Sequence, residues 1–112
     1  MKFLLLMYNH EDAFTEQEMK LEQCNAVALC NEIHAKGQFV SGTPLYPVAT
    51  AKSLRVRDGK RVVSDGPFAE TKEQLGGYVL VDVDTVDEAI EIAGRFPSAK
   101  VGTVEVRAIE EF

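Results

Sequence analysis

The residues best suited to chemistry lie in one polar interruption between two apolar runs, SDGPFAETKEQLGGY, residues 64–78. Asp65 comes near its start, and a carboxylate held at a pocket can accept a proton as a general base. Thr71 and Lys72 supply a hydroxyl and an ammonium group, and the ammonium can steady an anionic ligand. The segment therefore indicates binding of a small polar or anionic molecule, or proton transfer on one.

Residues 65–68, Asp-Gly-Pro-Phe, predict a stiff corner in the chain. Gly66 permits backbone conformations that are closed to other residues, and Pro67 fixes φ and removes an N–H donor. Phe68 is large and apolar, so we expect it to be buried, which is worth about 2 kcal/mol.

Two interpretations of this corner remain open. In the first, Asp65 caps a plain turn and Phe68 fills the core. In the second, the corner holds Asp65 as an acid–base group at the mouth of a pocket between the sheet and the helices. The rim of that pocket would then be formed by Glu70, Thr71 and Lys72.

Two histidines, His10 and His34, are candidate catalytic partners of Asp65. His10 follows the first predicted strand in a polar loop, a place that suits catalysis and also suits a solvated side chain. His34 lies near the end of the first predicted helix, where an imidazole can instead bond the last carbonyls and interact with the helix dipole. Three adjacent residues, His10-Glu11-Asp12, rarely converge on one ion, so we expect no metal site.

Tyr78 and Arg107 are two further candidates for ligand binding. Tyr78 opens a predicted strand after two glycines, where a phenol can present its polar tip to a cleft. Arg107 lies on the last predicted strand, and alternation puts it with Glu105 on the face opposite the valines at 104 and 106. An ion pair and a clamp on a ligand carboxylate both fit that position.

Composition excludes several classes of protein. The 112 residues carry a net charge of −6, a deficit of the basic residues that a phosphate-backbone binder needs, so we expect no direct nucleic-acid partner. The apolar start MKFLLLMY is too short for a membrane span or a signal sequence, which favours a first strand, a cytoplasmic location and no membrane partner. Cys24 and Cys30 lie about 9 Å apart along a predicted helix, which favours two buried thiols over a disulfide. No CxxC, HExxH, GxGxxG or P-loop pattern occurs, and we expect no cofactor.

Periodicity and capping signals predict β-α-β, then a β-hairpin, then β-α-β. Two T-x-x-E boxes, at Thr15 and Thr85, start the predicted helices. Asp58-Gly59 is a strong hairpin signal, which pairs Leu54 with Val63 on a side that should face inward. The predicted strands are 2–8, 38–45, 52–57, 60–64, 76–84 and one within 102–112, and the predicted helices are 15–36 and 85–96. The apolar stripes of the helices are Met19, Ala26, Val27, Cys30 and Ile33, and Val86, Ala89, Ile90 and Ala93.

This order predicts one domain over residues 1–112, of the α+β class, with a ferredoxin-like split βαβ arrangement and an inserted hairpin. Both helices then cover the same face of an antiparallel sheet. Because the other face has no helix to cover it, we expect a homodimer that packs sheet against sheet.

Four segments together resemble the YCII-related, or DGPF-domain, family: MKFLLLMY, VRDGKRVVSDGPF, DGPFAETKEQLGGY and PSAKVGTVEVR. The resemblance covers essentially the whole chain, and its most specific part is the DGPF-AETKE block. It implies a dimeric α+β barrel of ferredoxin-like protomers. It also implies either a small lyase- or hydrolase-like enzyme with a His–Asp pair, or a ligand-binding or regulatory module linked to a sigma factor of the extracytoplasmic-function type.

The chain departs from that family pattern at one important place. Members with the His–Asp pair carry the histidine early in the first helix, whereas here the region reads EQEMKLEQCNAVALC and holds none. The pair therefore cannot be carried over as a whole. The function stays open between a cofactor-free enzyme that uses Asp65 and a non-catalytic binding module.

Overall fold

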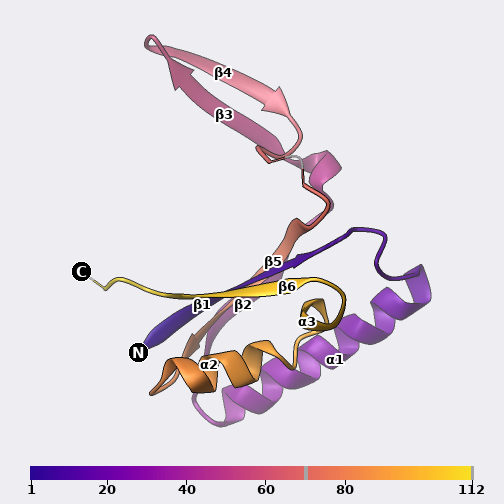
Figure 1. Ribbon diagram of the computed structural model, residues 1–112, viewed down its shortest axis with the longest axis vertical. Helices are drawn as coiled ribbons and strands as arrows, with labels where there is room; N and C mark the ends of the chain where they lie inside the picture. The colour runs from indigo at the N-terminus through magenta and orange to yellow at the C-terminus, as the bar shows by residue number, and fades with distance from the viewer. Residues whose placement is uncertain (70, 112) are drawn as a thin grey trace.

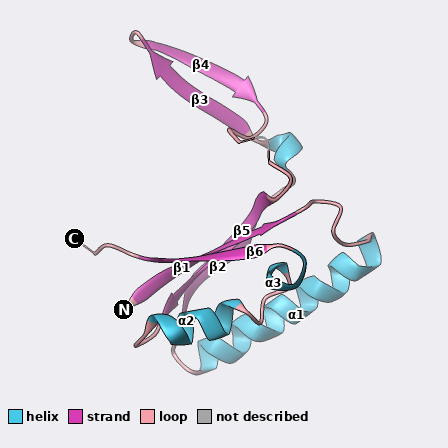
Figure 2. Cartoon of the chain, viewed as in Figure 1, coloured by secondary structure: helices cyan, strands magenta, loops and turns pink. Residues whose placement is uncertain are grey.

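The structure, a computed structural model, describes residues 1–69 and 71–111 and confirms a mixed α+β class. The chain divides into a body of sheet and helices and a hairpin that projects from it (Figures 1 and 2). The strands are β1 (Lys2–Asn9), β2 (Phe39–Pro44), β3 (Lys52–Arg57), β4 (Lys60–Asp65), β5 (Gln74–Asp82) and β6 (Thr103–Ala108). The helices are α1 (Glu16–Ala35), α2 (Val86–Ala93) and α3 (Ser98–Val101), with a 3₁₀ turn, η1, at Val48–Thr50.

The body contains a four-stranded sheet in the order β2-β5-β1-β6, in which every neighbouring pair is antiparallel. β1 and β2 therefore run in the same direction with β5 between them. β5 and β6 are likewise separated by β1. Figure 1 shows α1, α2 and α3 together on one side of this sheet.

The core lies between that side of the sheet and the helices. Alternate residues of β1 point into it, and Phe3, Leu5 and Met7 are buried while their neighbours are half-buried. This is the period of two that a strand imposes. The helices contribute other buried side chains, among them Leu29, Ile33, Ala89, Ile92 and Ala93.

Helix α1 begins as the capping box predicts. The Thr15 hydroxyl accepts the N–H of Glu18, and the Glu18 carboxylate accepts the N–H of Thr15. The predicted apolar stripe was partly wrong, because Val27 is exposed and Leu29 is buried in its place. The helix presents Leu29 and Ile33, four residues apart, to the sheet.

Helix α2 shows the same kind of shift. The Thr85 hydroxyl accepts the N–H of Glu88, as expected of an N-cap. Val86 and Ile90 were predicted to face the core, yet both are exposed, and Ile92 is buried. In both helices the sequence contains more apolar positions than the narrow contact with the sheet can cover.

The sheet face that lies opposite the helices, called the open face below, carries an apolar stripe with polar margins. Its central residues are half-buried by their own neighbours: Leu4, Leu6, Tyr8, Tyr78 and Leu80. Along β6 the corresponding positions are polar, Thr103, Glu105 and Arg107. No helix of the described chain covers this stripe in the views of Figures 1 and 2.

Strands β3 and β4 pair with each other to form a separate two-stranded sheet, residues 52–65, which we call the arm. Asp58 and Gly59 both have positive φ, 52° and 73°, and the register pairs Leu54 with Val63, so the hairpin prediction is confirmed. The side carrying Leu54 and Val63 does not face inward, because both side chains are more than half exposed. The radius of gyration, 15.7 Å, exceeds the roughly 13 Å of a compact chain of this length because the arm projects.

Two other sequence predictions concern single side chains and membrane spans. Both cysteines are free, but Cys24 is exposed and only Cys30 is half-buried. Burial raises the pKa of the Cys30 thiol. In the part of the chain that is described, the helices are all too short or too polar to span a bilayer.

Candidate functional site

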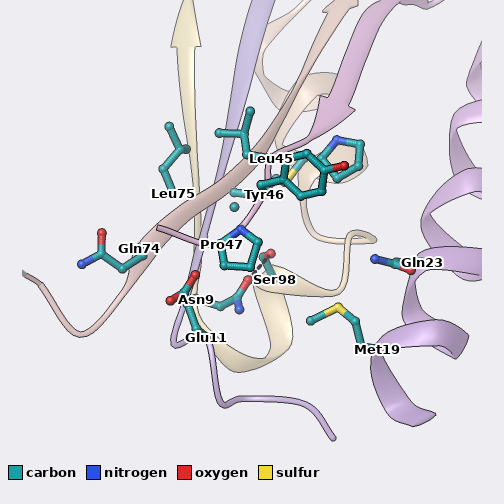
Figure 3. Close-up of a pocket in the computed structure, with 13 residues that line it drawn as sticks. Asn9, Glu11, Met19, Gln23, Leu45, Tyr46, Pro47, Gln74, Leu75 and Ser98 are labelled. Atoms are coloured by element: carbon teal, nitrogen blue, oxygen red, sulfur yellow. Dashed lines mark hydrogen bonds between the residues drawn. The ribbon is translucent and has the colours of Figure 1, made fainter. Parts of the chain in front are cut away.

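Two hollows meet at the end of the sheet where β1 finishes and β5 begins. The larger, which we call the helix-side hollow, measures about 690 Å³ and lies between this end of the sheet and α1 (Figure 3). The smaller, which we call the loop hollow, measures about 550 Å³ and is lined by Tyr8 and by residues of the loop before β5. Both volumes fall in the range of small-molecule sites.

A β-bulge at Gly76 creates this arrangement. Met7 pairs with Gly77 and Tyr8 pairs with Leu75, so Gly76 has no partner on β1. The extra residue re-aims the start of β5, as bulges commonly do beside functional sites. As a result Gln74 and Leu75 line both hollows.

A polar chain lies along the floor of the helix-side hollow. The Ser98 hydroxyl donates to Asn9 Oδ1 at 2.8 Å, and Asn9 Nδ2 donates to the His10 carbonyl at 2.9 Å. Both residues are half-buried and line the hollow, and Figure 3 shows them side by side. Gly102 lets the chain before β6 pass close to the end of β1. A Cβ at this position would overlap the Tyr8 carbonyl oxygen and lie 2.8 Å from Asn9 Cα.

The outer wall of the helix-side hollow is built from loops. Glu11 Oε2 accepts the N–H of Val48 at 3.0 Å, which ties the loop after β1 to the 3₁₀ turn after β2. Tyr46 lines the opening and is 86% exposed, so its phenol is available to a ligand or a partner. Met19 and Gln23 complete the opposite wall from α1.

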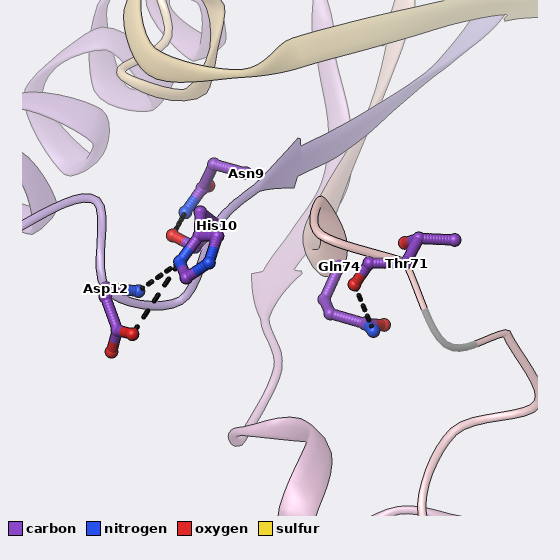
Figure 4. A network of polar contacts seen from close by, with 5 residues as sticks. All are labelled: Asn9, His10, Asp12, Thr71 and Gln74. Carbon is purple, nitrogen blue, oxygen red and sulfur yellow. Dashed lines mark hydrogen bonds and ion pairs between the residues drawn. The ribbon is translucent and has the colours of Figure 1, made fainter.

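Polar contacts hold the loop hollow in shape. Gln74 Nε2 donates to the carbonyl oxygens of Thr71, at 2.8 Å, and of Ala69, at 3.2 Å. The Thr71 hydroxyl donates to the Glu73 carbonyl at 2.5 Å. Figure 4 shows Gln74 and Thr71 facing the segment Asn9–Asp12 across the end of the sheet. Of the predicted binding residues, Pro67, Phe68, Thr71 and Lys72 line this hollow.

Asp65 stands at the base of the arm. Its carboxylate is 84% exposed and forms an ion pair with Lys52, its cross-strand partner. Gly66 follows with φ of 92°, and its N–H donates to the Ala51 carbonyl at 2.8 Å. The Ser53 hydroxyl donates to the Gly66 carbonyl at 2.8 Å, so the corner is held firmly. Neither of the two hollows, as lined by described residues, includes Asp65.

The prediction that Phe68 is buried was wrong. Its side chain is 76% exposed, because the corner lies at the base of the arm and Phe68 does not reach the core between the sheet and the helices. The Arg55 guanidinium lies over its ring at 5.0 Å from the centroid. This cation–π contact ties the loop to β3 and partly replaces the missing core contact.

The two histidines lie at opposite ends of α1. His10 Nδ1 accepts the N–H of Asp12 at 3.1 Å, so the neutral ring carries its proton on Nε2. Asp12 Oδ2, 3.8 Å away, can pair with the ring when Nδ1 is protonated (Figure 4). His34 is exposed, with its ring centroid 6.3 Å from that of Phe39. Neither imidazole contacts Asp65 in this chain.

The remaining candidates are spread over the open face. Tyr78 pairs with Leu6, and Arg107 pairs with Leu4. Arg107 Nε lies 3.3 Å from Glu105 Oε2, so the ion pair forms within β6. Glu70 lies outside the described residues.

An ion pair with shifted pKa values lies outside both hollows. Arg95, which follows α2, donates to both carboxylate oxygens of Glu32 on α1, with one contact at 2.8 Å. Hydrogen bonding to Arg95 holds the pKa of Glu32 below its usual value and raises that of the guanidinium. This pair joins α1 to the end of α2. The charged side chains that line the two hollows are Glu11, Lys72 and Glu73, and the other polar groups there are uncharged.

Sequence reasoning missed the helix-side hollow. Its polar residues are Asn9, Glu11, Gln23, Tyr46, Gln74 and Ser98, which come from five separate segments. The usable signal was positional, because Asn9 ends one strand and Gln74 begins its neighbour in the sheet. Within the described residues, no three His, Cys, Asp or Glu side chains converge in a way that could hold a metal ion.

The fold and the two hollows define an α+β protein with a ligand-sized depression at one end of its sheet. The sequence model of the YCII-related domain matches residues 1–112, and the chain belongs to that family. It is also similar to an uncharacterised protein of Rhizobium meliloti (strain 1021), at 34% identity over 97% of this chain and 92% of the relative.

Proposed function

We propose that the chain binds a small polar or anionic molecule at the end of the sheet, in the helix-side hollow. The observation that carries this proposal is the half-buried Ser98–Asn9 contact beside Gln74 in a hollow of about 690 Å³. A site of this kind needs a mainly apolar lining with a few fixed polar groups. Met7, Met19 and Leu75 supply the apolar part.

The proposal extends to the assembly. The strand order β2-β5-β1-β6, with each β-α-β unit enclosing a strand of the other, supports a ferredoxin-like split βαβ arrangement. The apolar stripe of the open face supports a homodimer that packs sheet against sheet as a dimeric α+β barrel. The loop hollow, which Tyr8 lines from the same face, would then adjoin the dimer interface.

The catalytic form of the proposal gives Asp65 the role of acid–base group, with His10 or His34 as a second one. Within one chain Asp65 is paired with Lys52, and the contacts of the two histidines are with Asp12 and Phe39. His10 lies nearest to the helix-side hollow, because it follows Asn9 directly. Catalysis by Asp65 would therefore need the arm to act on another copy.

Binding can be tested by amide chemical-shift mapping with a panel of small carboxylates, namely acetate, pyruvate, succinate and benzoate. We expect one of them to shift the amides of Asn9, Gln74 and Leu75. Ser98→Ala and Gln74→Leu should each weaken that probe about tenfold, the value of one lost hydrogen bond to a charged group. Gln17→Leu, an exposed position on α1, is the matched control. Shifts confined to residues outside the hollow would disprove the proposal.

The catalytic role has its own test. Asp65→Asn keeps the shape of the corner and removes the proton acceptor. If the wild-type protein converts a bound probe, the Asn variant should still bind it and lose conversion. Undiminished conversion by Asp65→Asn would exclude Asp65 as the acid–base group and leave the binding proposal intact.

A further inference from the structure

The arm is a regular two-stranded sheet that has no buried side chain. All of its residues are exposed except Ser53, which is half-buried. A lone two-stranded hairpin is marginally stable in water, because it lacks a third strand or a helix to cover it. We therefore expect one face of the arm to pack against another surface.

The two faces of the arm differ in chemistry. Alternation puts Leu54, Val56 and Val63 on one face, and each is more than half exposed. The same face also carries three charged side chains, Lys52, Arg61 and Asp65. The opposite face carries Arg55, Arg57 and Lys60, with Val62 as its one apolar side chain. The first face therefore has the larger apolar area and also basic side chains that can meet negative charge, whereas the second face is the more strongly basic one.

The charge of the arm is opposite to that of the rest of the chain. Residues 52–65 hold five basic and two acidic side chains, a net charge of +3. Because the whole chain carries −6, the remaining residues carry −9. The rest of a second copy thus has a net charge opposite in sign to that of the arm, which favours their association.

The position of the arm also points to a second copy. Figure 1 shows it rising on the side of the sheet away from the helices, the side that carries the open face. A copy seated on the open face would lie beside the arm, and two-fold symmetry would place its own arm beside the first copy.

We propose that the arm packs against a second copy of this chain that sits on the open face, with Leu54, Val56 and Val63 in the contact. This inference rests on the homodimer of the proposed function and identifies the arm as the element that stabilises that dimer. The partner also supplies the wall that the loop hollow lacks. That hollow is bounded by Tyr8 and the loop at the base of the arm, where Phe68 stays 76% exposed within one chain.

Two neighbouring valines provide a matched test. Val63→Asp charges the apolar face of the arm, and Val62→Asp makes the same change on the opposite face of the same strand. Sedimentation velocity across a concentration series gives the dimer dissociation constant. We expect Val63→Asp to raise it about 100-fold, because each dimer carries the change twice. Val62→Asp should raise it less than about fivefold.

Salt gives an independent readout on the wild-type protein. If the arm meets an acidic surface, raising the salt concentration from low to about 0.5 M should weaken the dimer, whereas a purely apolar contact would not weaken. A wild-type chain that stays monomeric throughout, equal losses for the two valine variants, or a dimer indifferent to salt would each overturn the proposal.

Failure of the arm proposal can be told apart from failure of the binding proposal. The arm variants leave Asn9, Gln74 and Ser98 unchanged, so carboxylate binding in the helix-side hollow is measured on the same samples. A dimer that resists Val63→Asp while the carboxylate binds overturns only the arm contact. A Val63→Asp-sensitive dimer that binds no carboxylate overturns only the ligand site.

Discussion

The body and the arm contain similar antiparallel strand pairs and differ in what covers them. On β1, Leu5 is fully buried between the sheet and the helices, whereas on β3 Leu54 is 56% exposed. β1 is apolar on both faces from Phe3 to Tyr8, whereas β3 alternates apolar with polar or basic residues, and both strands pair in antiparallel register. The comparison teaches that a strand pair gains its stability from a layer packed on one face, and that a pair without this layer is available for contact with another molecule.

The largest expected effect comes from truncating one leucine in the body and one in the arm. Leu5→Ala removes a fully buried side chain and should lower the free energy of unfolding by about 2–5 kcal/mol. Leu54→Ala should lower it by less than about 1 kcal/mol when the protein is dilute enough to be monomeric. Urea titration of both variants measures the difference. Similar losses would mean that the arm packs against its own body.

A smaller effect is expected at the junction of α3 and β6. Gly102→Ala places a Cβ into the Tyr8 carbonyl and against Asn9, so the backbone must shift there. We expect a loss of about 1–3 kcal/mol together with weaker carboxylate binding, since Asn9 lies in the helix-side hollow. The matched control is Gly94→Ala, where the nearest atom lies at 3.6 Å. Equal effects of the two changes would contradict a special role for Gly102.

The smallest effect concerns the two ion pairs. Arg95 lowers the folded-state pKa of Glu32 below the ordinary 4.5, so the pair stabilises the protein above that pH. Its contribution disappears as the pH falls through the lower folded pKa. Glu32→Gln should therefore lower the melting temperature at neutral pH. The melting temperature of this variant should also fall less than that of the wild type when the pH is lowered, as measured by thermal unfolding at a series of pH values.

Asp65→Asn is the counterpart in the arm, because it breaks the exposed pair with Lys52. We expect no measurable change in the unfolding of the body, since pairs of this kind contribute little. A destabilised body would mean that the corner at residues 65–68 is part of the core structure after all.

Much of the fold could be predicted from the sequence, because its signals are local. The capping box at Thr15 and the turn at Asp58-Gly59 both depend on residues a few positions apart, and both are confirmed. The buried faces of the helices were predicted less well. Val27 and Ile90 fit a helical stripe, yet the faces that α1 and α2 present are decided by the sheet they pack on.

The candidate site was harder to predict, for a physical reason. Asn9, Gln74 and Ser98 meet only because β1 and β5 pair and α3 lies at their end, which no local pattern encodes. The DGPF corner, by contrast, stands out in the sequence, but its Phe68 was expected inside the core and lies outside it. A distinctive segment such as residues 65–68 can be recognised in the sequence, but the sequence does not show which surface its side chains contact.

The exposed turn at the tip of the arm has a consequence for the lifetime of a lone copy. Arg57, Lys60 and Arg61 flank Asp58-Gly59 with no core contact to protect them, so an unaccompanied chain offers a ready substrate to any protease that cuts after basic residues. A second copy packed on the arm would slow that cleavage. Because dimer formation increases with concentration, the rate of degradation per chain would then fall as the protein becomes more abundant.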